Sequence, residues 1–268
     1  MMGSGKETMP VLHTYDMGSG VMAFSTTRQG GVGTGRYGQM NINSFCGDEP
    51  QAVAANRLLL AHELGIPETC IVMPHQTHGT VCVAVDNRLT GLTEEAHKAS
   101  LEGVDGLMTR TPGLCIGVST ADCIPVLLYD AEHRAVAAVH AGWRGTVARI
   151  TRKAVEAMTR HYATRPEMLK AVIGPGISLE SFEVGQEVYD CFSNAGFNMD
   201  SMARRFDKWH IDLPACNAMQ LQEAGVEPEN IHLSGICTYK QPDRFFSARR
   251  LGVQSGRIFN GILLKGEK

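Results

Sequence analysis

Three short segments in the middle of the chain contain side chains of the kinds that bind transition metals. They are His75-Gln-Thr-His78-Gly79, Ala121-Asp122-Cys123-Ile-Pro125 and His140-Ala-Gly-Trp143-Arg144-Gly145. Zinc and copper bind neutral imidazole nitrogens and thiolates, and three such ligands with one open position form a catalytic site. Because each segment lies at the end of a strand-like run, we expect the three to meet in one metal site.

Within these segments, Cys123 and His140 are the best ligand candidates. His140 ends an apolar run and is followed at once by a helix start, a place where ligand-binding side chains commonly lie. A buried core thiol is the alternative for Cys123. His75 is three residues from His78, a separation that does not keep one face of a strand, so we expect it near the surface or behind the ligands.

Two charged neighbours are candidate catalytic residues. In a regular strand Asp122 faces away from Cys123 and is structural, whereas at a strand end it orients an imidazole or takes a proton. Arg144 follows the metal histidine at a helix start, where guanidinium binds phosphate bidentately, and a solvated cation is its alternative. We interpret both as catalytic candidates beside Cys123 and His140.

Composition limits the classes of partner. With 268 residues and 43% hydrophobic content, the chain suits a single domain over residues 1–268, with about the first ten residues disordered. The net charge of −3 gives no reason to expect a nucleic-acid or membrane partner, so we expect a small ligand. No apolar run approaches the roughly 20 residues needed to span a bilayer, which predicts a cytoplasmic protein. Eight irregularly spaced cysteines indicate reduced thiols, mostly in the core.

The pattern predicts an α+β protein with mixed sheets, because strand-like and helix-like runs are interspersed and some strands look buried on both faces. Expected strands cover 21–26, 70–73, 80–85, 106–109, 114–118, 125–129, 135–140, 171–173 and 257–264. Expected helices cover 50–64, 145–161, 186–194 and 213–224, the first opened by Pro50 and ended by Gly65.

The amino-acid sequences of the segments are more specific for one protein family than the spacing of the candidate ligands is. QTHG, ADCIPVLLYD and AAVHAGWRGT, with FSTTRQGGV from Phe24, VIGPGI from Val172 and FEVG from Phe182, resemble the YfiH-like family, also described as multicopper polyphenol oxidase or laccase-domain proteins. The resemblance extends in order over nearly the whole chain. It implies a four-layer α/β/β/α sandwich with the metal site in a cleft near its surface.

The resemblance also implies site residues. The QxHG pattern makes His78 the third metal ligand, with zinc as the expected cofactor and copper as the alternative, and Gly79 permits a sharp turn after it. Arg28 with Gly30-Gly31 forms a candidate anion loop. Asn41 is a candidate for hydrogen bonds to a sugar or a base. Arg249 and Arg250 match the family pattern, although a charged strand edge is their default interpretation.

The function implied by the resemblance is a purine nucleoside phosphorylase with adenosine deaminase activity, monomeric or homodimeric. It would convert adenosine, inosine or methylthioadenosine and phosphate into the base and a ribose 1-phosphate sugar. One alternative is a copper-dependent polyphenol oxidase, which the 10 mostly isolated histidines disfavour. A second is a metal-free hydrolase with Cys123 as nucleophile and His140 as base. A non-enzymatic alternative is a module that buffers metal or regulates a partner.

Overall fold

The computed structural model describes residues 9–266, and within this range the strands form three sheets. The two larger sheets are mixed, because each contains parallel and antiparallel pairs, and the third is antiparallel. In spatial order the first sheet contains β1 (Leu12–Tyr15), β2 (Val21–Thr26), β14 (Ile258–Leu264), β6 (Cys115–Thr120) and β3 (Ile71–Val72). The second contains β13 (Ile231–Leu233), β9 (Lys170–Ile173), β7 (Ile124–Asp130), β8 (Ala135–Ala141), β5 (Gly106–Thr109) and β4 (Cys82–Ala84). The third contains β10 (Glu183–Val184), β12 (Trp209–Ile211) and β11 (Ala203–Arg205).

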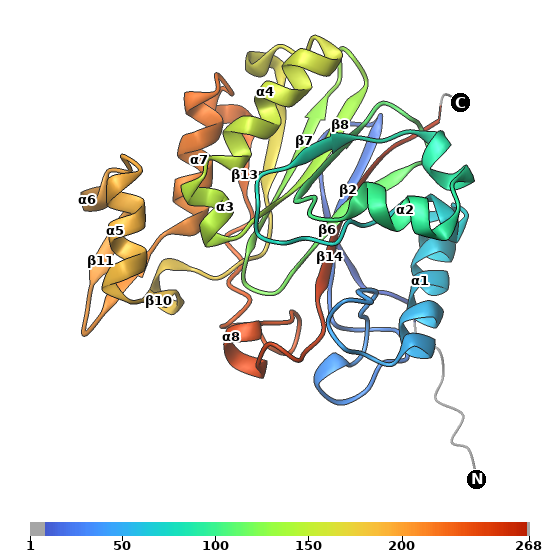
Figure 1. The fold of residues 1–268 in the computed structure, drawn as a ribbon, viewed down its shortest axis with the longest axis horizontal. Coiled ribbons are helices and arrows are strands. Elements are labelled where there is room, and N and C mark those ends of the chain that lie inside the picture. The colour runs from blue at the N-terminus through green and yellow to red at the C-terminus, as the bar shows by residue number, and fades with distance from the viewer. Residues whose placement is uncertain (1–8, 267–268) are drawn as a thin grey trace.

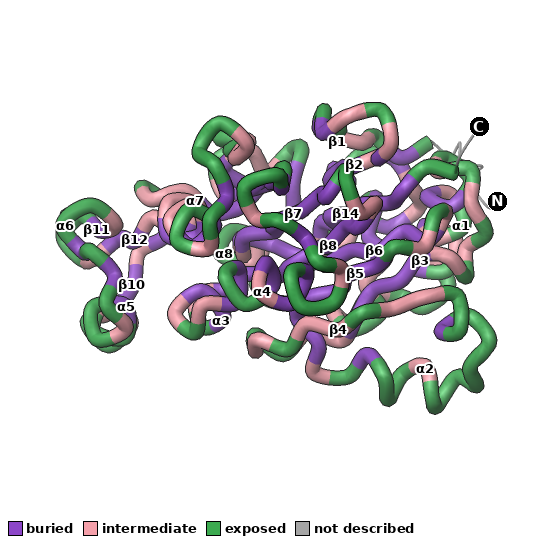
Figure 2. Tube along the Cα trace, turned by 90° about the horizontal axis from the view of Figure 1, so that it is seen from above, coloured by how far each residue is buried: buried purple, intermediate pink, exposed green. Residues whose placement is uncertain are grey.

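The two large sheets share one apolar core. Ile116 and Ile262 of the first sheet belong to the same buried cluster as Leu127, Ala138 and Val172 of the second. The central strands β6, β7, β8 and β14 are buried along their whole length, as the continuous purple segments of Figure 2 show. Burial on both faces explains why these strands read as unbroken apolar runs instead of alternating ones.

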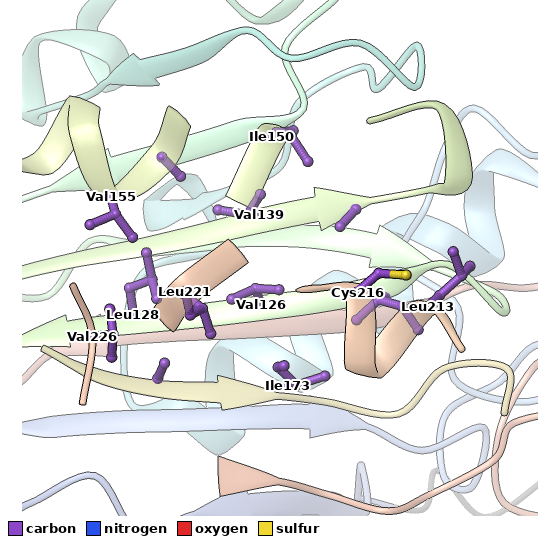
Figure 3. Packing of buried hydrophobic residues seen from close by; sticks show 14 of the residues in the cluster. Val126, Leu128, Val139, Ile150, Val155, Ile173, Leu213, Cys216, Leu221 and Val226 are labelled. Carbon is purple, nitrogen blue, oxygen red and sulfur yellow. The ribbon is translucent and has the colours of Figure 1, made fainter. Parts of the chain in front are cut away.

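Helices pack on the outer face of the six-stranded sheet. Here α4 (Ile150–Tyr162) and α7 (Leu213–Glu223) bury their apolar side chains against β7 and β8, as Figure 1 and Figure 3 show. Val126 and Val139 of the sheet lie in one cluster with Ile150 and Leu221 of the helices. The fully buried leucine and isoleucine side chains each contribute about 1.5–3 kcal/mol through their removal from water.

On the other side, α1 (Pro50–Leu64) covers the five-stranded sheet, where Leu60 packs with Phe24 and Phe259. Pro50 opens this helix, and Gly65 ends it in the left-handed conformation (φ 66°), as predicted. The structure is therefore a mixed α/β fold, as predicted, in which two packed sheets lie between α1 on one side and α4 with α7 on the other.

The predicted helix over residues 145–161 is wrong in one respect. The chain forms α3 (Trp143–Val147) and α4 as separate helices, because Arg149 between them adopts a left-handed φ of 64°. The Arg149 guanidinium donates to the Ala195 carbonyl at 3.0 Å and lies over the Phe197 ring at 3.9 Å. These tertiary contacts hold the break, and nothing in the local pattern reveals them.

Other differences concern short or exposed elements. Arg249 and Arg250 do not lie on a strand edge, because α8 (Ala248–Leu251) contains them. Cys191, expected in the core, is exposed on α5 (Gln186–Asn194). The pattern also missed α2 (Glu94–Leu101), α6 (Met199–Met202) and the small third sheet, which projects from the body of the molecule with α5 (Figure 1). All eight cysteines are free.

Two expectations about the chain as a whole meet limits in the structure. Disorder is expected for about the first ten residues. Residues 1–8 of that segment lie outside the described residues. Between residues 9 and 266, no helix combines the length and the apolar character needed to cross a membrane.

Candidate metal centre and ligand cavity

Three strand ends of the six-stranded sheet bring the candidate residues together. The antiparallel register pairs Pro125 with His140, so Cys123, just before β7, lies beside the end of β8. On the other side of β8, Gly106 pairs with Val139, which places Asp105 next to His140. The backbone N–H of His140 donates to the Asp105 carbonyl at 2.8 Å. The sheet register therefore positions a thiol, an imidazole and a carboxylate at one end of the six-stranded sheet, where β7, β8 and β5 begin or end.

Asp105 connects the segment that contains His78 to this end of the sheet. Its carboxylate accepts backbone hydrogen bonds from Gly79 at 2.7 Å, His78 at 3.0 Å and Thr77 at 3.3 Å. These bonds hold the loop before β4 in a shape that gives His78 a positive φ of 62°. The sharp turn predicted at Gly79 is therefore made by His78 itself, and the backbone hydrogen bonds to Asp105 offset its strain.

The same carboxylate orients His140. Nδ1 of His140 lies 2.7 Å from Asp105 Oδ1, and both side chains are almost fully buried. Because a carboxylate can only accept, Nδ1 carries the proton and Nε2 is left to bind a metal, the usual support for a metal-bound histidine. Asp105 thus fixes the ring of one candidate ligand and the backbone of another.

The donor atoms fit a metal ion. Ligand atoms of His78, Cys123 and His140 all lie within 4.8 Å of one another. The distance from Cys123 Sγ to His78 Nε2 is 3.9 Å, near the about 3.6 Å that tetrahedral zinc would set between a sulfur and a nitrogen ligand. A Cβ at Gly142 would lie 2.8 Å from the His78 ring and 3.2 Å from Cys123 Sγ. Glycine is needed there because its backbone packs directly against the ligands.

The electrostatics favour a thiolate at Cys123 and a protonated His140 in the metal-free protein, so a metal ion would displace a proton from the imidazole on binding. Burial alone would raise the pKa of the Cys123 thiol, but the positive charge of His140 and hydrogen bonds with both histidines lower it to about 6. Burial would lower the pKa of His140, yet the Cys123 thiolate and Asp105 raise it to about 9. For Asp105, burial raises the pKa and the hydrogen bond from His140 lowers it, with a net lowering. A thiolate near neutral pH is the form in which cysteine binds metals.

A cavity of about 380 Å³ opens over these three residues. This volume is within the range of small-molecule sites. Its other polar walls include His75, Asn43, Gln76, Ser119, Thr120 and Arg257, and its apolar walls include Phe45, Pro74, Ala248 and Val253. The three residues that could hold a metal ion therefore line a cavity of a size suited to a small molecule.

Several predicted ligand-binding residues lie outside the walls of this cavity. Arg28 donates to the backbone carbonyls of Gly38 at 3.0 Å and Pro242 at 2.7 Å. Asn41 is fully buried and donates to Asp48 Oδ2 at 2.8 Å. Both side chains stabilise the loops around the cavity in this structure, and their binding roles stay predictions.

The same holds for the charged residues predicted beside the ligands. Arg144 is exposed, with its guanidinium 4.3 Å from the centre of the Trp143 ring. Arg249 and Arg250 donate to the backbone carbonyls of Glu183 and Tyr239. None of the three lines the cavity. Their proposed contacts with phosphate stay predictions.

Asp122 is buried and held from two sides. Its carboxylate accepts from the Thr238 hydroxyl and from the backbone N–H of Arg249, each at 2.7 Å. Asp122 has a positive φ of 87°, so strand alternation does not apply to it. It anchors the turn that presents Cys123, which is a positioning contact, and its catalytic role stays a prediction.

The sequence interpretation missed Asp105, Phe45, Gln76, Ser119 and Arg257. Asp105 had a usable signal, since an acidic side chain directly before an apolar strand lies at a strand end, where functional side chains gather. Arg257 opens the predicted strand over 257–264 and had the same signal. Gln76 had a signal as well, because it opens the QxHG pattern. Phe45 had none, because only the tertiary fold brings its loop to the cavity.

Fold and site together define a mixed α/β protein with a candidate metal centre of two histidines and one cysteine at one end of the six-stranded sheet. A family model described as multi-copper polyphenol oxidoreductase laccase matches residues 22–265, and the chain belongs to this family. A purine nucleoside phosphorylase of Bacteroides thetaiotaomicron is 46% identical over 250 residues, 92% of each chain. Adenosine deaminase RL5 of an unknown prokaryotic organism is 45% identical over 249 residues, 92% of this chain and 95% of that protein. The crystal structure of the Bacillus licheniformis hypothetical protein YfiH superposes with a TM-score of 0.89 at 29% identity, covering 96% of this chain and 97% of that one.

Proposed function

We propose that this protein is a metal-dependent purine nucleoside phosphorylase that also deaminates adenosine. The observation that carries the proposal is the cavity, which joins the His78–Cys123–His140 centre to a cationic wall residue, Arg257. Phosphorolysis needs a place for phosphate beside the reacting sugar, and a guanidinium is well suited to hold it. The names of the relatives at 46% and 45% identity support the two reactions.

Arg257 differs from the other candidate arginines by its position, because it lines the cavity and they do not. Its guanidinium donates to the backbone carbonyls of Val253 at 2.8 Å and Gly256 at 3.0 Å. Among residues 9–266, no carboxylate forms an ion pair with it. Backbone carbonyls fix the guanidinium but leave its positive charge available to an anion. Phosphate is the anion that the proposed reaction requires.

In phosphorolysis, an oxygen of phosphate forms a bond to C1′ of the ribose while the bond from C1′ to N9 breaks. The electron pair of that bond passes to the purine, which takes up a proton, and the products are the base and ribose 1-phosphate. In deamination, water adds at C6 of adenosine and ammonia leaves, giving inosine.

Zinc, or copper in its place, would supply Lewis-acid chemistry at the floor of the cavity. The chain's own residues hold the reacting groups in place. Asp105 keeps the His140 ring in one tautomer, Cys123 is held as a thiolate, and Arg257 orients phosphate. We include adenosine, inosine and methylthioadenosine among the substrates of the proposed enzyme.

The test is a product analysis with purified protein loaded with zinc or with copper. Adenosine is incubated with and without phosphate, and adenine, inosine and hypoxanthine are separated by chromatography. We expect adenine only when phosphate is present, inosine in both cases, and neither from Cys123→Ser. Activity that survives complete metal removal would instead indicate a hydrolase using Cys123 and His140 directly.

A pair of arginine variants tests the place of phosphate. Arg257→Gln should raise KM for phosphate about 10-fold or more, in line with the about 1.5–3 kcal/mol of a charged hydrogen bond, and leave deamination unchanged. Arg144→Gln is the matched control, because Arg144 is exposed and outside the cavity. If Arg144→Gln raised KM for phosphate and Arg257→Gln did not, phosphate would be assigned to Arg144 and the assignment to Arg257 would be overturned.

A further inference from the structure

The cavity over the metal centre has an aromatic wall whose position the metal chemistry does not explain. The Phe45 side chain is 50% exposed although it is large and apolar. One face of its ring is stacked on His75, with ring centres 4.3 Å apart and planes 25° from parallel. Since His75 covers one face and half of the side chain is still exposed, the ring offers free aromatic surface where a ligand enters.

His75 is held firmly behind this ring. Its Nδ1 lies 2.8 Å from the Glu102 carboxylate, and its backbone N–H donates to the Leu101 carbonyl at 3.0 Å. The N–H of Gly103 donates back to the His75 carbonyl at 3.0 Å. The histidine that is not a metal candidate is therefore a rigid support for the ring of Phe45.

Phe45 is also held from its own side. Its backbone N–H donates to Asn43 Oδ1 at 2.6 Å, and the Asn43 amide donates in turn to the Ser119 hydroxyl. A ring fixed from behind and through its backbone loses little conformational entropy when a ligand stacks on it. The geometry thus gives a preorganised flat surface beside the metal centre.

Two amide side chains in the cavity wall are already engaged by other groups of the protein. Both polar atoms of the Gln76 amide bind the backbone of Ser119, at 2.7 and 2.8 Å. The amide of Asn43 is engaged by Phe45 and Ser119. These two amides are therefore not free to bind the edge of a planar ring, whereas the Phe45 ring is free to contact its face.

We propose that the ring of Phe45, backed by His75, is the platform on which the planar purine of the nucleoside stacks. The inference rests on the proposed function and adds a positioning residue to it. Stacking tolerates different bases because every base has a π-face. Adenosine and inosine should consequently depend on Phe45 to the same degree, although they differ at C6.

Binding and kinetics of Phe45 variants test the platform. Base–aromatic stacking corresponds to about 5- to 150-fold in affinity. Phe45→Leu should raise Kd and KM for adenosine and inosine by a factor in this range. We expect kcat, zinc content and KM for phosphate to stay within about twofold, and Phe45→Tyr to restore wild-type binding. Phe206→Leu is the matched control, since Phe206 is 57% exposed and lies outside the cavity.

A spectroscopic reporter checks that the base contacts this ring. In Phe45→Trp, added adenosine should quench the emission of the new tryptophan, whereas in Phe206→Trp it should not. Both variants keep Cys123 and are loaded with zinc. The wild-type chain, which contains Trp143 and Trp209, gives the background emission.

The two proposals fail in different ways. Equal adenosine binding by the wild type and Phe45→Leu, or no adenosine binding by the wild type, would overturn the platform. A wild type that binds adenosine through Phe45 but forms no product with phosphate or water would support the platform and overturn the proposed function.

Discussion

Replacing Asp105 by asparagine should weaken metal binding without changing any metal ligand. Oδ1 of the carboxylate accepts from His140 and from the backbone of His78, and Oδ2 accepts from the backbones of Gly79 and Thr77. An amide keeps only one oxygen. In either orientation its NH₂ group faces two N–H donors, so two hydrogen bonds are lost and either the His140 ring or the His78 loop is released.

The magnitude follows from burial. The Asp105 side chain has 0% exposure and that of His140 has 3%. Two buried donors left unpaired cost about 1–3 kcal/mol each, which agrees with the about 3–5 kcal/mol lost when one partner of a buried ion pair is removed. Loss of support for a ligating histidine typically lowers metal affinity by about 10- to 100-fold. Asp105→Asn should show both effects.

The assay is a zinc titration against a chromophoric chelator, with urea unfolding of the metal-free protein beside it. Asp130→Asn is the matched control, because Asp130 has a 2% exposed side chain and pairs with His133 Nδ1 at 2.9 Å at the opposite end of β7. It should lose stability and keep wild-type zinc affinity. If folded Asp105→Asn bound zinc within twofold of the wild type, the supporting role assigned to Asp105 would be refuted.

Three further outcomes are expected. In metal-free protein the Cys123 thiol, with its pKa lowered to about 6, should deprotonate as pH rises through that value, giving an ultraviolet thiolate absorbance that is absent from Cys123→Ser; a midpoint above 8 would contradict the ion pair. Gly142→Ala places a methyl group 2.8 Å from the His78 ring, so zinc affinity should fall about 10-fold or more while urea unfolding changes little by comparison; unchanged affinity would count against the packing argument. Asn217→Leu leaves two buried threonine hydroxyls without their amide partner and should cost about 2–4 kcal/mol in unfolding free energy, with a loss below about 0.5 kcal/mol as the contrary result.

Much of the central fold could be predicted from local pattern. The strands at 21–26 and 106–109 and the helix at 186–194 have the predicted bounds, because buried apolar runs and helix caps are local signals. The helix break at Arg149 could not be predicted, since its cause is a contact with Ala195 and Phe197, distant in sequence. The small third sheet has strands of two or three residues, too short for a periodic pattern.

Cys123 and His140 were recognisable as candidates from their residue types at strand ends, whereas His78 was assigned through the QxHG pattern of the family resemblance. The residues that organise them were harder to find. Asp105 acts through a pairing between β5 and β8 that the spacing of residues does not reveal. Phe45 lies on a loop that precedes all three candidate ligands in the sequence and reaches the cavity only through the tertiary fold. The predicted arginines lie outside the cavity, and their guanidinium groups contact backbone carbonyls or an aromatic ring elsewhere. Residue type predicts chemistry, but register and loop packing decide which side chains reach it.

The family description names a multi-copper laccase, and the site geometry argues against transferring that chemistry. Electron transfer from a phenol to oxygen through several coppers needs several sets of ligands, each with its own histidines. Across residues 9–266, the group of His78, Cys123 and His140 is the one cluster of three potential ligand side chains close enough to hold an ion. His75, the nearest further histidine, is bound to Glu102 and stacked on Phe45. A single centre under a cavity with a cationic and an aromatic wall suits the binding of a nucleoside and phosphate better than an electron relay.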